Sequence, residues 1–119
     1  MKNDNSVNLR SEIEIAFARL IGPLATMSVL DCFKEDCTEI KNLLDIISKW
    51  SAEFQLKKTL SFISRENLLA IYDRIETLKE KYLYDISLGD ENELSDEVGI
   101  WLWELMNLRK KQIEGDEKK

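Results

Sequence analysis

The chain has 119 residues, of which 17 are Lys or Arg, 23 are Asp or Glu and none is His, so its formal net charge is −6. This length suits one compact domain, and 44% hydrophobic with 34% charged residues is typical of a folded protein. Without histidine there is no Ser–His or Cys–His catalytic pair, no imidazole base and no imidazole metal ligand. We therefore expect a protein that is not an enzyme and holds no cofactor.

The charge balance also predicts the kind of partner. Phosphate backbones and anionic lipid headgroups are repelled by a net charge of −6, so we expect neither nucleic acid nor membrane as a partner. Residues 1–14 contain no apolar run typical of a signal peptide. The longest uncharged stretch, residues 20–30, is too short to span a bilayer. These features favour a cytoplasmic protein whose partner is basic.

Helical periodicity dominates the chain between two polar tails, residues 1–7 and 114–119, which we expect to fray. The first predicted helix ends at Gly22 and Pro23, because proline lacks the amide hydrogen and clashes with the preceding turn. Residues 24–33 predict a short, almost wholly apolar second helix. The apolar face of the first helix consists of Leu9, Ile13, Phe17 and Leu20.

Two amphipathic helices follow. The third begins after Asp36, which forms a variant of the capping box with Glu39. The fourth begins after Ser64, a predicted N-cap, and ends near Gly89, since glycine tolerates the left-handed C-cap conformation. The inward-facing residues are Ile40, Leu43, Leu44, Ile47, Trp50 and Phe54 in the third helix, and Leu68, Ile71, Tyr72, Ile75, Leu78, Tyr82 and Ile86 in the fourth.

A fifth helix is predicted from Asp90 or Ser95, with basic residues 109–111 at its C-terminal end, where they suit the helix dipole. Trp103 lies about 200° around this helix from Trp101, so the two cannot face one core. The helix is therefore either surrounded or has a face that awaits a partner. Its predicted stripe is Leu94, Val98, Trp101, Leu105 and Leu108. The whole pattern predicts an all-α, compact bundle of four to five helices, forming a single domain over residues 1–119.

The cysteines and the carboxylates of the fourth helix predict no metal site. Cys32 and Cys37 lack a second pair of zinc ligands, and the acidic residues around them raise a thiol pKa instead of activating it. We interpret both cysteines as buried small hydrophobic residues. Asp73, Glu76 and Glu80 are interleaved with basic residues, which favours a solvated face over a di-metal site.

Most of the net charge lies in one segment, because residues 82–108 contain seven acidic residues and no basic one. The calcium-loop spacing fits neither the register from Asp85 nor that from Asp90. Two interpretations stay open: a solvated loop whose acids suit a helix N-terminus, or a surface that binds a basic partner through acids and exposed aromatic residues. The candidate partner-binding residues are Tyr84, Asp85, Asp90, Glu91, Glu93, Asp96, Glu97 and Trp103.

These features together favour a small acidic binding protein of the bacterial immunity-protein or antitoxin type. Its acids would pair with lysines of a basic, nuclease-like toxin, and Trp103 and Tyr84 would anchor the contact, so that inhibition is occlusion. One alternative is a phage-type inhibitor or nucleic-acid mimic that acts on a DNA-binding enzyme. Another is a self-associating helical regulatory or adaptor module, in which a homodimer buries Trp103.

Overall fold

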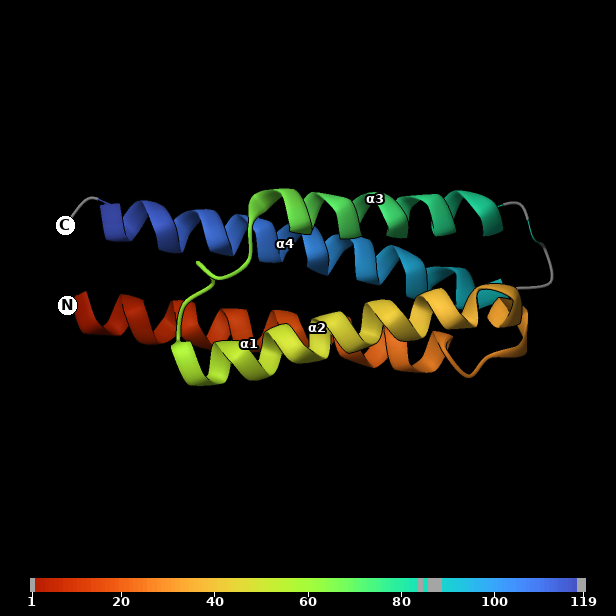
Figure 1. The fold of residues 1–119 in the computed structure, drawn as a ribbon, viewed down its shortest axis with the longest axis horizontal. Helices are drawn as coiled ribbons and strands as arrows, with labels where there is room; N and C mark the ends of the chain where they lie inside the picture. Colours follow the sequence, from red (N-terminus) through yellow and green to blue (C-terminus); the bar gives the residue numbers. More distant parts are fainter. Residues whose placement is uncertain (1, 84, 86–88, 118–119) are drawn as a thin grey trace.

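The protein is an up-down-up-down bundle of four helices: α1 (Lys2–Met27), α2 (Cys37–Lys57), α3 (Arg65–Tyr82) and α4 (Asn92–Glu117). Two short 3₁₀ helices, η1 (Asp31–Asp36) and η2 (Gly89–Glu91), precede α2 and α4. This computed structural model describes the backbone of residues 2–83, 85 and 89–117 and the side chains of residues 8–83, 85 and 91–114. The start of α1 and the end of α4 lie at one end of the bundle, and η1 and η2 lie at the other (Figure 1). The predicted all-α bundle is confirmed.

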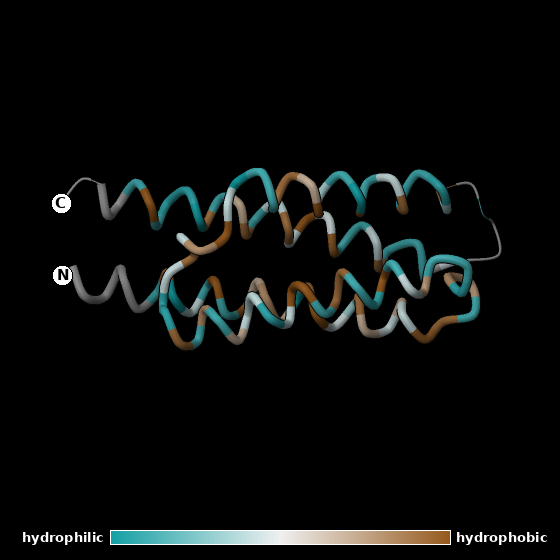
Figure 2. Tube along the Cα trace, in the orientation of Figure 1, coloured by the Kyte–Doolittle hydropathy of each residue, from teal (hydrophilic) through white to brown (hydrophobic). Residues whose placement is uncertain are grey.

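One hydrophobic core runs along the bundle. The backbone of α1 lies close to α2 and α4, and that of α3 lies close to α4. Hydrophobic and hydrophilic residues alternate along the helices, as amphipathic helices require (Figure 2). The apolar faces predicted for the first, third and fourth helices, which are α1, α2 and α3, are largely confirmed. Their buried residues include Ile13, Phe17, Leu20, Ile40, Leu43, Ile47, Phe54, Leu68, Ile71, Ile75, Leu78 and Tyr82.

The predicted break at Gly22 and Pro23 is wrong, since α1 runs through Pro23 to Met27. Proline removes one backbone hydrogen bond, but Leu20, Leu24 and Met27 are fully buried along one face around it. Burial of this face outweighs the lost bond, so residues 24–27 are the last turn of α1 and no separate second helix forms. The helices also extend into both predicted tails, because α1 begins at Lys2 and α4 ends at Glu117.

The predicted helix ends are partly confirmed. Ser64 caps α3, because its Oγ accepts a hydrogen bond of 3.0 Å from the backbone N–H of Asn67. Asp36 stands at the N-cap position of α2, but its side chain makes no capping bond there, so the predicted capping box is wrong. The predicted end of α3 near Gly89 is also wrong: α3 ends at Tyr82, and Gly89 begins η2 with a φ of +54°.

The connection between α2 and α3 is fastened to α4. Gln112 accepts a hydrogen bond of 2.7 Å from the backbone N–H of Leu60 and donates one of 3.2 Å to the carbonyl of Lys58. Arg109 donates through Nε to the carbonyl of Ile63 at 2.6 Å. Because α4 continues to Glu117, Arg109 lies within the helix and serves this connection, not the end of the helix dipole.

Candidate functional site

The outer face of α4 exposes two large apolar side chains, Ile100 (63% exposed) and Trp103 (52% exposed). Of the two sequence-based alternatives for this helix, a surrounded helix or one with an uncovered face, the structure shows the second. Trp101 does not occupy the core as predicted: Leu102 is fully buried, whereas Trp101 is half-buried. The guanidinium of Arg19 lies 4.3 Å from the centroid of the Trp101 ring, a cation–π contact that suits a side chain at the edge of the core.

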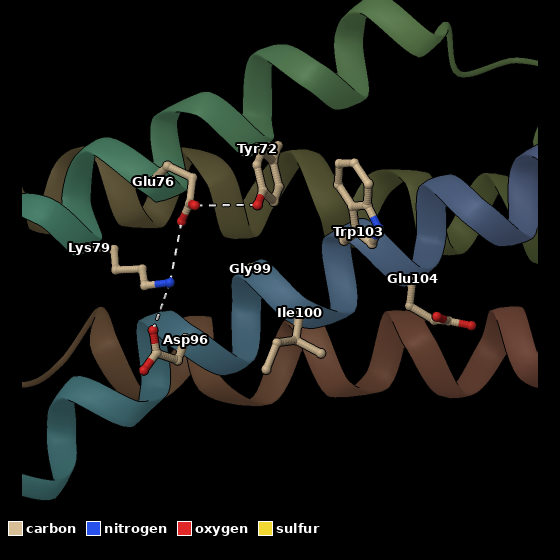
Figure 3. Close-up of a pocket in the computed structure, with 8 residues that line it drawn as sticks. All are labelled: Tyr72, Glu76, Lys79, Asp96, Gly99, Ile100, Trp103 and Glu104. Carbon is tan, nitrogen blue, oxygen red and sulfur yellow. Dashed lines mark hydrogen bonds and ion pairs between the residues drawn. The ribbon is translucent and has the colours of Figure 1, made fainter.

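A groove between α3 and α4 lies beside Trp103 (Figure 3). Tyr72, which was expected to face inward, is half-buried, and its ring lies 5.5 Å from that of Trp103, with 54° between the planes. The Tyr72 hydroxyl donates a hydrogen bond of 3.3 Å to Oε1 of Glu76. Burial, and then the carboxylate of Glu76, raise the pKa of Tyr72. Trp103 therefore presents apolar surface to solvent, whereas the Tyr72 hydroxyl already has a hydrogen-bond partner.

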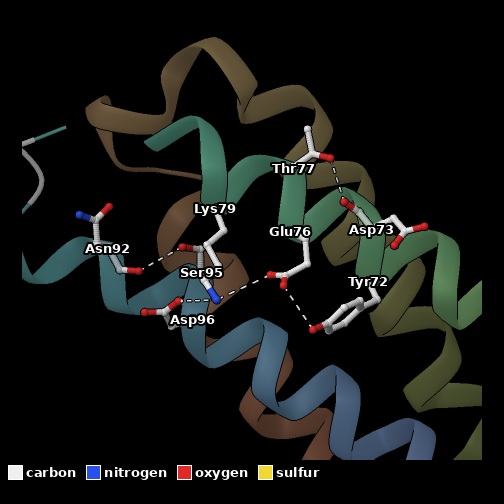
Figure 4. A network of polar contacts seen from close by, with 8 residues as sticks. All are labelled: Tyr72, Asp73, Glu76, Thr77, Lys79, Asn92, Ser95 and Asp96. Atoms are coloured by element: carbon white, nitrogen blue, oxygen red, sulfur yellow. Dashed lines mark hydrogen bonds and ion pairs between the residues drawn. The ribbon is translucent and has the colours of Figure 1, made fainter. Parts of the chain in front are cut away.

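Lys79 neutralises two carboxylates in the same groove, those of Asp96 and Glu76. Its Nζ lies 3.0 Å from Oδ1 of Asp96 and 3.7 Å from Oε2 of Glu76, and Figure 4 shows it between the two carboxylates. The hydrogen bond with Asp96 is the largest cause of the raised pKa of Lys79. Asp96, a predicted partner-binding residue, is therefore already paired across α3 and α4. It contributes less to the outward negative field than its neighbours Glu93 and Glu97.

A second groove, between α1 and α4, lies on the other side of Ile100 and is lined by Glu12, Ile15 and Glu104 among others. Ile15 is 49% exposed. We call Ile15, Ile100 and Trp103, with the acids Glu12, Glu97 and Glu104 at their border, the α4 patch. The three acids have no ion pair within the part of the chain that the structure describes.

Sequence reasoning missed Ile15 and Ile100, although a signal was present for both. Ile15 follows the core residue Ile13 by two positions, and Ile100 follows the core residue Val98 by two. Residues two apart in a helix point about 200° away from each other. Each of the two isoleucines therefore had to leave its own core face, as Trp103 did.

The remaining predicted residues lie toward the η1–η2 end of the bundle. Asp85 is exposed and Glu91 is half-buried, and both add to burial in raising the pKa of the Cys32 thiol. The acidic surroundings of this thiol were predicted correctly, but Cys32 and Cys37 are only half-buried. Tyr84 and Ile86 lie outside the described residues, as does the side chain of Asp90, whose backbone belongs to η2.

The predicted residues therefore do not form one cluster. Glu91 and Trp103 are twelve residues apart in sequence, roughly 18 Å along a helix. Glu93 and Glu97 are exposed and lie between them on α4. The acids follow α4 from the η2 end toward Trp103. Asp96 lines the groove with Ile100 and Trp103, and Glu97 stands three residues before Ile100 on the same helix.

Asp36 has a structural role that the sequence did not reveal. Its side chain is 16% exposed, accepts a hydrogen bond of 2.8 Å from Nζ of Lys81 and accepts another from the hydroxyl of Tyr82. Burial alone would raise the pKa of this carboxyl, but the two hydrogen bonds outweigh it and lower the pKa. The side chain thus joins the start of α2 to the end of α3.

This lowered pKa predicts a loss of stability in acid. The charged carboxyl stabilises the fold at pH values above the ordinary Asp value of 3.8, and this contribution disappears as the pH falls through the lower, folded-state pKa. We expect Asp36→Asn to lower the free energy of unfolding by about 1–3 kcal/mol at neutral pH and by less at about pH 2–3. Urea titrations at both pH values measure the difference. Asp45→Asn, at an exposed ion pair, should change stability by about 0.5 kcal/mol or less, and an equal loss for Asp36→Asn at both pH values would contradict the prediction.

The two grooves on either side of Ile100 form a continuous contact surface along α4. Among the side chains that the structure describes, no group of three or more Cys, Asp or Glu residues is placed to hold a metal ion. No single described helix is both long and apolar enough to cross a membrane, and Asn8–Met27 with Asp31–Lys57 satisfies that test only as a pair bent by 102°. Comparisons with protein-family models, with curated proteins and with solved structures find no match to this chain.

Proposed function

We propose that this chain is a small, acidic, non-enzymatic binding protein that acts in the cytoplasm. Its partner is a basic protein, most simply a nuclease-like toxin, which it inhibits by covering the surface that holds substrate phosphates. The observation that carries the proposal is the α4 patch, where Ile100 and Trp103 are more than half exposed within a border of acidic residues. Apolar patches with a charged rim are typical of protein–protein interaction sites.

The charges of the patch favour a basic partner. Glu12 and Glu104 line the groove beside Ile100, and Glu97 stands one helical turn before it. None of the three has an ion pair in the described part of the chain, and Lys79 is held by Asp96 and Glu76. Lysines and arginines of the partner would meet these carboxylates, and Trp103 would be the desolvated anchor between them. The acids toward η2 add long-range attraction that speeds association.

The test is affinity capture with the tagged chain in extracts of the cells that encode it, at low and at high salt. We expect one basic protein that is retained at low salt and lost at high salt. Glu93→Lys with Glu97→Lys should abolish the capture. With the partner purified, we expect its association rate to fall about tenfold or more between low and physiological salt, and its nuclease activity to be lost at one equivalent of the chain.

Asp45→Lys with Glu53→Lys is the matched control, because it changes the net charge equally on α2, away from the α4 patch. Capture that survives this control but not the α4 variant supports the proposal. Equal loss with both variants would mean that only total charge matters. Capture of an acidic protein, or of none, would overturn the proposal, and a captured DNA-binding enzyme without nuclease activity would favour the nucleic-acid mimic.

A further inference from the structure

The exposed residues of α4 change charge along the helix. Glu93 and Glu97 lie on the N-terminal half, Ile100 and Trp103 at the centre, and Lys110 and Lys111 on the C-terminal half, and all six are exposed. The first four follow one another at spacings of four, three and three residues, and Lys110 comes seven residues after Trp103. Helical spacing therefore places them along one side of α4, and Lys111 stands two further turns beyond Trp103 on the same side. One surface strip therefore carries two exposed acids toward its N-terminal end, an apolar centre, and two exposed lysines followed by Glu114 toward its C-terminal end.

This strip is complementary to itself in the antiparallel direction. Glu93 and Lys111 are each nine residues from Leu102, roughly 13–14 Å along the helix axis. A twofold axis that crosses the exposed side of α4 at the level of Leu102 would place the acidic end of one copy against the basic end of the other. Ile100 and Trp103 from both copies would lie between these ends. A parallel pair would set acid against acid and base against base, which costs binding energy.

We propose that the free protein is an antiparallel homodimer in which a second copy covers this strip of α4. Such an interface is isologous, because the same residues contribute from both copies. The apolar centre is widened by Ile15, which lines the groove between α1 and α4 together with Ile100. A basic partner would compete for the same surface, so binding the partner requires the dimer to separate.

One residue opposes the dimer. Glu104 lies two positions from Leu102, so the two copies of its carboxylate approach each other near the axis. Like charges brought together at an interface weaken association. Glu104→Gln should therefore tighten the dimer, whereas the same change should weaken binding of a basic partner.

The experiment measures the mass of the purified chain by sedimentation equilibrium over a range of concentrations. We expect twice the chain mass of 13.9 kDa for the wild type, and a monomer for Lys110→Glu with Lys111→Glu. Glu93→Lys with Glu97→Lys should also be a monomer. Mixed in equal amounts, the two variants should form a heterodimer, because both ends of the strip are then acidic in one variant and basic in the other.

Lys41→Glu with Lys49→Glu on α2 makes the same change of net charge away from the strip and should remain a dimer. A monomeric wild type at the highest soluble concentration, or variants that do not pair when mixed, would overturn the proposal. The Lys110 and Lys111 variant also separates this inference from the proposed function. It should lose the dimer and yet bind a basic partner at least as well as the wild type, whereas the Glu93 and Glu97 variant should lose both.

Discussion

Trp103→Ala is expected to weaken binding of the basic partner by about 2 kcal/mol or more, roughly thirtyfold in Kd. The indole is 52% exposed and rests against the Tyr72 ring, so it is available to a partner and its orientation is already restricted. Isothermal titration of the captured partner measures the loss. The parent protein and the Trp103→Ala variant should both carry Lys110→Glu and Lys111→Glu in addition, so that self-association does not compete with the partner.

Leu56→Ala is the control for this substitution, since Leu56 is 82% exposed but lies on α2. It should leave partner affinity unchanged. The free energy of unfolding should fall only slightly in both variants, because neither side chain is buried. If the two variants lost the same affinity, or if Trp103→Ala lost none, the prediction that Trp103 is part of the binding surface would be wrong.

The second large effect is on stability. Phe54 is fully buried, and its ring centroid lies 6.1 Å from that of Phe17, where the faces of α1 and α2 meet. We expect Phe54→Ala to lower the free energy of unfolding by about 3–5 kcal/mol, because it removes buried apolar area and leaves a cavity. Domains are commonly stable by only about 5–15 kcal/mol, so this variant should be close to unfolding at 37 °C. Chemical denaturation followed by circular dichroism measures the change.

Phe62→Ala provides the comparison, because Phe62 is half-buried and has Lys57 5.3 Å from its ring centroid. The same chemical change at this site should cost clearly less than at Phe54. If both variants lost the same free energy, the core would not be centred on the Phe17 and Phe54 pair.

The sequence predicted the helices with strong periodicity and failed where two effects competed locally. Ile40, Ile47 and Phe54 recur at helical spacing, and burial of that face fixes α2 whatever its ends do. At Pro23 the packing of the buried residues around it outweighs the helix-breaking effect of proline, and α1 continues. Such a contest is decided by tertiary contacts, which no local pattern contains.

The site was partly predictable for a similar reason. The spacing of Trp101 and Trp103 showed that one indole had to leave the core, and Trp103 is the exposed one. It did not show that Leu102 would face the core between them, or that Lys79 of α3 would reach Asp96. The first depends on how α4 is rotated against α1 and α3. The second joins residues that only the packed helices bring together.

The close packing of α1 against α4 has a consequence for synthesis of the protein. Translation delivers helices in order, so α1, α2 and α3 are complete before the ribosome has made α4. Until then Val98, Leu102 and Leu105, all fully buried in the finished bundle, are not there to cover α1 and α3. The nascent chain therefore carries an incomplete core with exposed apolar surface, the kind of species that aggregates or recruits chaperones. The bundle can be completed only after α4 has been translated, although neighbouring helices can begin to pair earlier.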